Sequence, residues 1–81
     1  MSTPAVTLTQ LAVGSRASVS AIHGEDGLAA RLLDLGLTPG APVRLMRRAP
    51  LGGVLLVRVR DYLLALRPDE AARVSVAEAV G

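Results

Sequence analysis

The sequence LAARLLDLGLTPG, at positions 28–40, predicts a short helix that ends in a tight turn. Leucines recur at helical spacing from Leu28 to Leu35, which places them on one face that a core can cover. Gly36 follows at the position where helices commonly end with a left-handed residue. Pro39 cannot continue a helix, and together with Gly40 it predicts a tight turn.

The residues before this helix predict one strand and one polar loop. Small apolar and polar residues alternate from Arg16 to Ile22, which is the pattern of a half-buried strand. The segment His23–Gly27 is polar, so we expect a loop there, with Asp26 as the N-cap of the helix. Earlier in the chain, Leu8–Leu11 predicts a helical turn, and Gly14 separates it from the strand.

Two strands joined by a loop are expected after the helix. From Pro42 to Arg48 apolar residues alternate with charged or flexible ones, as in a strand with one buried face. Residues 49–53 predict a loop because they contain one proline and two glycines. In the following strand, the alternate positions expected to face the core are Leu55, Val57 and Val59. Leu56 should then point outward.

The rest of the chain predicts further short elements. A reversal near Asp61 leads to a short strand at Leu64–Leu66, and Pro68–Ala71 predicts one helical turn. A last strand should pass through Val74 and Val76. About five short strands and one short inserted helix favour a mainly β fold, a small and partly open barrel rather than a sandwich.

The length and composition indicate a single domain. With 81 residues, the chain can bury only a modest core. It has no cysteine, and its hydrophobic content of 51% is mostly Ala, Val and Leu, so aliphatic packing must hold the fold together. We expect a flexible N-terminus at residues 1–6, the folded domain at residues 7–77 and a C-terminal tail at residues 78–81.

Neither a signal peptide nor a membrane helix is expected. Met1–Pro4 lacks the positive charge and the apolar stretch with which a signal peptide begins. The apolar run Val54–Val57 ends at Arg58, far short of the roughly 20 residues that span a bilayer. We therefore expect a cytoplasmic protein that does not insert into a membrane.

The residues needed for catalysis are missing. The chain has one histidine and no cysteine, and Gly24–Gly27 lacks the Gly-Lys-Ser/Thr ending of a phosphate-binding loop. A nucleophile and its base would have to be Ser18 or Ser20 with His23, and so small a domain is not expected to hold a deep pocket. We therefore predict a binding module without a cofactor rather than an enzyme.

A metal site is a weak candidate. His23, Glu25 and Asp26 lie close together in the sequence and could contact a metal ion. Two or three ligands on a mobile loop leave coordination positions open, so a solvated polar loop is favoured.

Nucleic acid is the second possible ligand, after a metal ion. The arginines that could form one basic face on adjacent strands are Arg44, Arg47, Arg48, Arg58 and Arg60. Single-strand binders also stack bases on aromatic side chains, and Tyr62 is the only aromatic residue in the chain. A solvated basic face is therefore favoured, and no nucleic-acid partner is expected.

Leu51 and Leu56 are candidates for a protein contact. Leu56 should point outward from its strand, and Leu51 lies in the loop between a proline and a glycine. A shift of register by one residue would exchange the faces of the strand, and single exposed leucines are common. The pattern alone therefore leaves a contact and an ordinary surface equally open.

Several motifs together resemble those of the FeoA family. They are Gly14, Arg31-Leu32, Leu35-Gly36-Leu37, Pro39-Gly40, Ala49-Pro50-Leu51-Gly52 and Leu64-Ala65-Leu66-Arg67. The resemblance runs from about Leu8 to Val76, and the helix end followed by Ala-Pro-Leu-Gly is specific at this spacing. It implies an SH3-like barrel with a helix inserted after the first strand.

The resemblance also implies a function. FeoA proteins are small partners of the bacterial ferrous-iron transporter FeoB, which carries a cytoplasmic GTP-binding domain. The leading hypothesis is a non-catalytic accessory protein that binds FeoB and modulates transport or its GTP cycle. The candidate contact residues are Arg31, Leu51 and Leu56, with a polar rim of Arg47, Arg48 and Arg58. The residues interpreted as structural turns are Gly36, Pro39, Gly40, Pro50 and Gly52.

The chain departs from the family pattern at two places. Gly53 and Val54 replace the Asp and Pro often found there, so a more flexible loop is expected. Asp61 replaces a frequent glycine at the reversal, where aspartate tolerates a left-handed turn.

Other functional hypotheses stay open beside the leading one. They are an arginine that enters the GTP site of FeoB, a nucleic-acid-binding small barrel, and a metal-sensing module like the C-terminal domain of iron-dependent repressors. A weak homo-oligomer also stays open.

Overall fold

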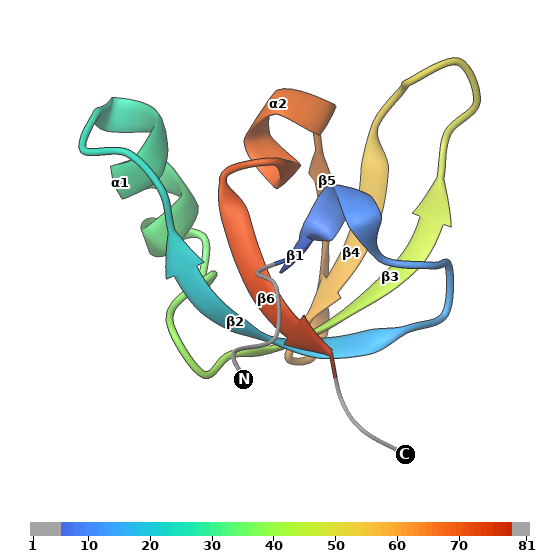
Figure 1. The fold of residues 1–81 in the computed structure, drawn as a ribbon, viewed down its shortest axis with the longest axis horizontal. Helices are drawn as coiled ribbons and strands as arrows, with labels where there is room; N and C mark the ends of the chain where they lie inside the picture. Colours follow the sequence, from blue (N-terminus) through green and yellow to red (C-terminus); the bar gives the residue numbers. More distant parts are fainter. Residues whose placement is uncertain (1–5, 79–81) are drawn as a thin grey trace.

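One antiparallel sheet of six strands curls around a single core in the computed structural model, which describes residues 6–78 (Figure 1). The strands are β1 (Val6–Thr7), β2 (Arg16–Ile22), β3 (Pro42–Arg48), β4 (Leu55–Val59), β5 (Tyr62–Leu66) and β6 (Val74–Glu78). They pair in the order β1-β6-β2-β3-β4-β5, so β1 and β5 are the two edges. The helices are the 3₁₀ turn η1 (Leu8–Gln10), α1 (Gly27–Asp34) and α2 (Pro68–Ala71).

This architecture confirms the predicted mainly β fold with one short helix inserted after the first long strand. The sequence did not reveal β1, because two residues are too few to show an alternating pattern. Val6 pairs with Val76 in β1, and Glu78 is the last residue of β6, so the strands extend one residue beyond each predicted boundary of the domain. Residues 1–5 and 79–81, the rest of the predicted N-terminus and C-terminal tail, lie outside the described part of the chain.

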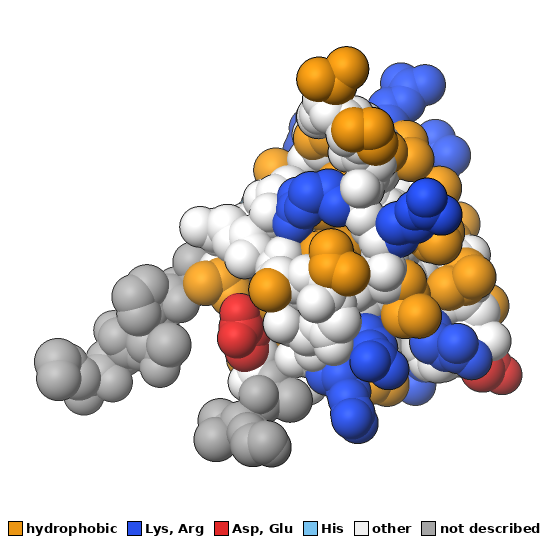
Figure 2. All heavy atoms as spheres, turned by 90° about the vertical axis from the view of Figure 1, so that its right-hand side faces the viewer, with side chains coloured by type: hydrophobic (Ala, Val, Ile, Leu, Met, Phe, Trp, Pro, Cys, Tyr) orange, Lys and Arg blue, Asp and Glu red, His pale blue; other side chains and the backbone are white. Residues whose placement is uncertain are grey.

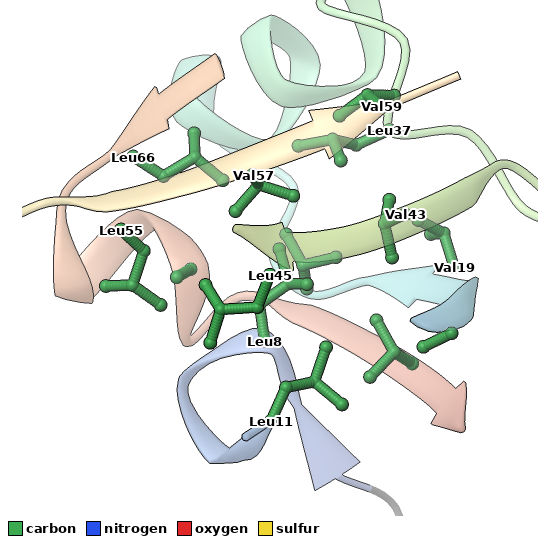
Figure 3. Close-up of a cluster of buried hydrophobic side chains, with 14 of the residues drawn as sticks. Leu8, Leu11, Val19, Leu37, Val43, Leu45, Leu55, Val57, Val59 and Leu66 are labelled. Carbon is green, nitrogen blue, oxygen red and sulfur yellow. The ribbon is translucent and has the colours of Figure 1, made fainter. Parts of the chain in front are cut away.

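The core is built from aliphatic side chains of nearly every element (Figure 3). Leu55, Val57 and Val59 all point inward from β4 and are almost completely buried, as their alternation predicted. From η1, Leu8 points into the same cluster, and Leu11 follows it. Because α2 packs beside η1, these two short elements cover the part of the core that the sheet leaves open.

Helix α1 has the predicted start and end. The Asp26 carboxylate accepts a hydrogen bond of 3.2 Å from the Ala29 amide, which makes Asp26 the N-cap. At the other end, Gly36 has a φ of 101°, and its amide donates to the Leu33 carbonyl, while the Leu37 amide donates to that of Leu32. These two bonds form a Schellman motif, and they turn the chain so that Leu37 enters the core.

Two details of the sheet differ from the simple alternation expected. Met46 is an extra residue in β3: Leu45 pairs with Val57 and Arg47 with Leu56, so Met46 has no partner. At the β4–β5 reversal, Arg60 and not Asp61 takes the left-handed conformation, with a φ of 55°.

None of the helices between residues 6 and 78 is long and apolar enough to cross a membrane.

Candidate functional site

The end of the β3–β4 hairpin, residues 49–54, projects from the barrel and is called the β3–β4 tip below (Figure 1). The Gly53 amide donates to the Pro50 carbonyl at 3.3 Å, and the Ala49 amide donates to the Val54 carbonyl at 2.9 Å. The loop that the sequence predicted at residues 49–53 is thus a hydrogen-bonded turn.

Leu51 occupies the extreme end of this turn. Its relative exposure of 104% means that no other residue covers it, and its φ is 61°. Gly52 also has a positive φ of 70°, so the two central residues resemble those of a type I′ turn, which favours Asn and Gly. A leucine in the left-handed region costs about 1–2 kcal/mol. Neither burial nor backbone geometry therefore explains leucine at this position.

A hollow of about 290 Å³ lies at the base of the β3–β4 tip. It is called the tip hollow, and its lining residues are Arg47, Ala49, Pro50, Val54 and Leu56. Figure 2 shows this side of the molecule, where hydrophobic side chains gather at the top and arginines lie around and below them. The tip hollow and Leu51 together form an apolar surface with a cationic side.

The width of the turn depends on Gly53. A Cβ atom at Gly53 would lie 2.8 Å from Cβ of Ala49 and 3.3 Å from the Pro50 carbonyl oxygen. A side chain does not fit at position 53, because the two arms of the β3–β4 tip approach each other closely there.

The structure brings together only part of the candidate contact set. Leu51, Leu56 and Arg47 share the β3–β4 tip and its hollow. Arg31 lies on α1, at the opposite side of the molecule in Figure 1. Arg58 lies in a different hollow, whose lining includes Arg16 and Arg44.

Arg48 has a structural role beside any contact that it makes. Its guanidinium donates to the carbonyls of Thr9 and Leu11, at 3.0 and 2.8 Å. These bonds satisfy carbonyl groups at the end of η1 and tie that turn to β3. The expected turn glycines Gly36, Gly40 and Gly52 all have a positive φ, as the sequence predicted.

The residues of the weak metal candidate are engaged with other side chains. Arg73 donates to the Asp26 carboxylate at 2.6 Å, and this bond, with that from the Ala29 amide, lowers the pKa of Asp26. His23 Nε2 is hydrogen-bonded to Ser75 Oγ. Within residues 6–78, no three His, Cys, Asp or Glu side chains are grouped so that they could hold a metal ion.

Sequence reasoning missed part of the apolar surface. Val54 is 45% exposed and lines the tip hollow, and so do Ala49 and Pro50, of which Pro50 was interpreted only as a turn residue. The short apolar run after the two glycines was a usable signal, because Val54 precedes the first inward residue of β4, Leu55.

Known proteins resemble this chain over most of its length. The structure of Stenotrophomonas maltophilia FeoA complexed with zinc, described as a prokaryotic SH3 domain protein, is 39% identical, with a TM-score of 0.78 over 88% of each chain. This likeness confirms the SH3-like barrel.

Two further proteins resemble the chain, one in sequence and one in fold. A fusion of Fe(2+) transport protein A and the Fe(2+) transporter FeoB from Porphyromonas gingivalis is 29% identical over 69 residues, which cover 85% of this chain and 8% of that protein. A manganese-dependent transcriptional repressor shares the fold with a TM-score of 0.85 over 98% of this chain and 44% of its own, at 19% identity. The repressor's likeness concerns the fold alone.

The family model for the FeoA domain matches residues 6–78, which are the same residues that the structure describes. The helix end at Gly36 and the Ala-Pro-Leu-Gly turn, which carried the resemblance in the sequence, both lie within this match. The chain therefore belongs to the FeoA family.

Proposed function

We propose that this chain is a non-catalytic, cytoplasmic accessory protein that binds a FeoB-type ferrous-iron transporter through the β3–β4 tip. Docking there modulates transport or the GTP cycle of the transporter. The observation that carries this proposal is Leu51, a fully exposed leucine held on a left-handed backbone at the end of a hydrogen-bonded turn.

The energetics of Leu51 favour a partner. Burying a leucine side chain contributes about 1.5–3 kcal/mol. In the free protein Leu51 contributes none of this, and its backbone conformation has a cost of about 1–2 kcal/mol. A partner that covers the β3–β4 tip supplies the missing burial, and the turn needs no rearrangement to present the side chain.

The surroundings of Leu51 suit a central anchor with a polar rim. The tip hollow adds apolar area from Val54 and Leu56, and Arg47 lies at its side. Interfaces commonly have such a buried apolar centre, with charged side chains toward the edge. The fusion protein of Porphyromonas gingivalis supports FeoB as the partner, because a related segment there belongs to the same polypeptide as the transporter.

The test is a binding titration of the full chain against FeoB of the same organism, purified in detergent, with a GTP analogue or with GDP. The wild-type chain should bind, and Leu51→Asn should weaken the affinity by about tenfold or more, as for a buried anchor residue. Leu56→Thr should weaken binding by a smaller factor, because Leu56 is already half-buried in the free protein.

The matched control is Leu63→Asn, which makes the same change at an exposed leucine on β5, outside the tip hollow. It should leave the affinity almost unchanged. Absence of binding in both nucleotide states, or an equal loss in Leu51→Asn and Leu63→Asn, contradicts the proposal. Affinity that depends on the nucleotide would support an effect on the GTP cycle.

A further inference from the structure

A second hollow, of about 360 Å³, lies on the outer face of the sheet where β2, β3 and β4 run side by side. It is called the arginine hollow, because its lining includes Arg16, Arg44, Arg58 and Arg60. Its volume is within the range of small-molecule sites. This surface plays no part in the docking proposed for the β3–β4 tip.

Three of these arginines form a row across the strands. Arg16 is the register partner of Arg44, and Arg44 is the register partner of Arg58. Like charges placed directly opposite each other destabilise a sheet. The row therefore concentrates positive charge on one surface and lowers the stability of the sheet.

No acidic side chain between residues 6 and 78 forms an ion pair with these arginines. Among residues 6–78 the one ion pair within 4 Å joins Arg73 and Asp26, and neither of these lines the arginine hollow. Asp61, which follows Arg60 in the chain, is exposed and makes no such pair. The guanidinium groups of the row are available to an external anion.

The central arginine of the row is held in place by the backbone. Arg44 Nε donates to the Gly14 carbonyl oxygen at 3.1 Å, across from β3 to the turn before β2. This bond uses one N–H of the guanidinium and leaves its terminal amino groups free to donate. An arginine fixed in this way loses less conformational entropy when it binds an anion.

The spacing of the row favours a chain of phosphates over a single one. Neighbouring strands lie about 4.8 Å apart, so the three side chains of the row extend over about 10 Å. Arginine binds phosphate oxygens in a bidentate manner, and successive phosphates can each meet a different guanidinium. The residues that line the arginine hollow include no aromatic side chain, and Tyr62 donates its hydroxyl to the Leu35 carbonyl, so stacking of a base is not provided for.

We propose that the arginine hollow binds a linear oligophosphate, and that it recognises the phosphate chain itself. Free inorganic oligophosphate and the triphosphate of a nucleotide share this chemistry. The two sources differ in the base and sugar, for which the hollow has no dedicated contact.

The experiment is a calorimetric titration of inorganic triphosphate into the full chain at low ionic strength. Saturable binding with one site per chain is expected, and it should weaken as salt is added, because the arginines are exposed. Arg58→Gln should weaken it by about tenfold, the effect of one lost charge-assisted hydrogen bond. Arg67→Gln removes the same charge outside the hollow and should leave the affinity almost unchanged.

Two further measurements compare a nucleoside triphosphate with inorganic triphosphate and check that the Arg58→Gln variant is folded. A nucleoside triphosphate that binds like inorganic triphosphate supports recognition of the phosphate chain, whereas clearly tighter binding of the nucleotide contradicts it. The thermal midpoint of Arg58→Gln should not fall, because the substitution relieves like-charge contact with Arg44. The proposal is overturned by absence of saturable binding, by an equal loss in Arg67→Gln, or by a single-stranded oligonucleotide that binds more tightly than triphosphate.

Discussion

Arg47 lies directly opposite Leu56 across β3 and β4, because Met46 is an extra residue in β3 without a partner. Without this bulge, Met46 would face Leu56. The bulge therefore places a cationic side chain next to the apolar residues of the tip hollow. Bulges commonly redirect side chains near functional sites, and this one gives the proposed docking surface its charge.

The Leu51→Asn variant tests whether Leu51 contributes to the stability of the free protein. Asparagine tolerates the left-handed conformation better than leucine, and Leu51 has no burial to lose. We expect the free energy of unfolding to stay the same or to rise by up to about 1 kcal/mol. Chemical denaturation of the wild-type and variant chains measures this. A loss of more than about 1 kcal/mol would show that Leu51 supports the fold and would remove the main reason for assigning it to a partner.

Leu45→Ala is the opposite case, because Leu45 is completely buried in the centre of the core. Removal of a buried leucine side chain costs about 2–5 kcal/mol. Small domains have a total stability of about 5–15 kcal/mol, so the variant should be near the limit of folding. Circular dichroism during thermal unfolding measures the change. A midpoint close to that of the wild type would be incompatible with the packing in Figure 3.

Gly36→Ala should be destabilising for two separable reasons. The φ of 101° disfavours any side chain, and a Cβ atom there would collide with the Tyr62 hydroxyl, which donates to the Leu35 carbonyl. We expect a loss of at least about 1–2 kcal/mol from the backbone conformation alone. In a double-mutant cycle with Tyr62→Phe, removal of the hydroxyl should recover part of the loss and leave the backbone part. Strict additivity of the two single variants would exclude the collision.

The Asp26–Arg73 pair predicts a pH dependence of stability. Hydrogen bonds from Arg73 and from the Ala29 amide lower the pKa of Asp26 in the folded chain. A carboxyl group with a lowered folded pKa stabilises the protein above its unfolded pKa of about 3.9, and this contribution disappears as the pH falls through the folded value. The difference in thermal midpoint between the wild type and Asp26→Asn should therefore be present at neutral pH and shrink below about pH 4. A difference that stays constant down to pH 2 would show that the charge has no role.

Much of the fold was predictable because two of its signals are local in the sequence. They are the alternation of inward and outward residues in strands and the residues that begin and end a helix. The bounds of β2 and β3 and the inward residues of β4 follow from alternating side chains, and α1 follows from its cap and Gly36. The bulge at Met46 was not predictable, since an inserted residue leaves the composition of a strand unchanged. The left-handed residue of the β4–β5 turn is Arg60 and not Asp61, and the Arg60 amide donates to the Pro42 carbonyl, a bond between distant parts of the chain that local sequence does not show.

The candidate site was predictable only in part, for the same reason. Leu51, Leu56 and Arg47 are close in sequence, and the structure places them at one end of one hairpin. Arg31 is separated from them by the fold, and Arg58 joins Arg16, a residue of another strand. Which arginines gather on one surface depends on strand order and register, neither of which can be read along the chain.

The most direct test of docking through the β3–β4 tip is a methyl spectrum of the chain with labelled leucines, recorded with and without FeoB in detergent. The signals of Leu51 and Leu56 should shift or broaden most, while Leu63 on β5 and Leu33 on α1 keep their positions, because both are exposed but lie outside the tip hollow. Changes centred on Leu63 or Leu33, with the Leu51 signal unmoved, would contradict docking through the β3–β4 tip.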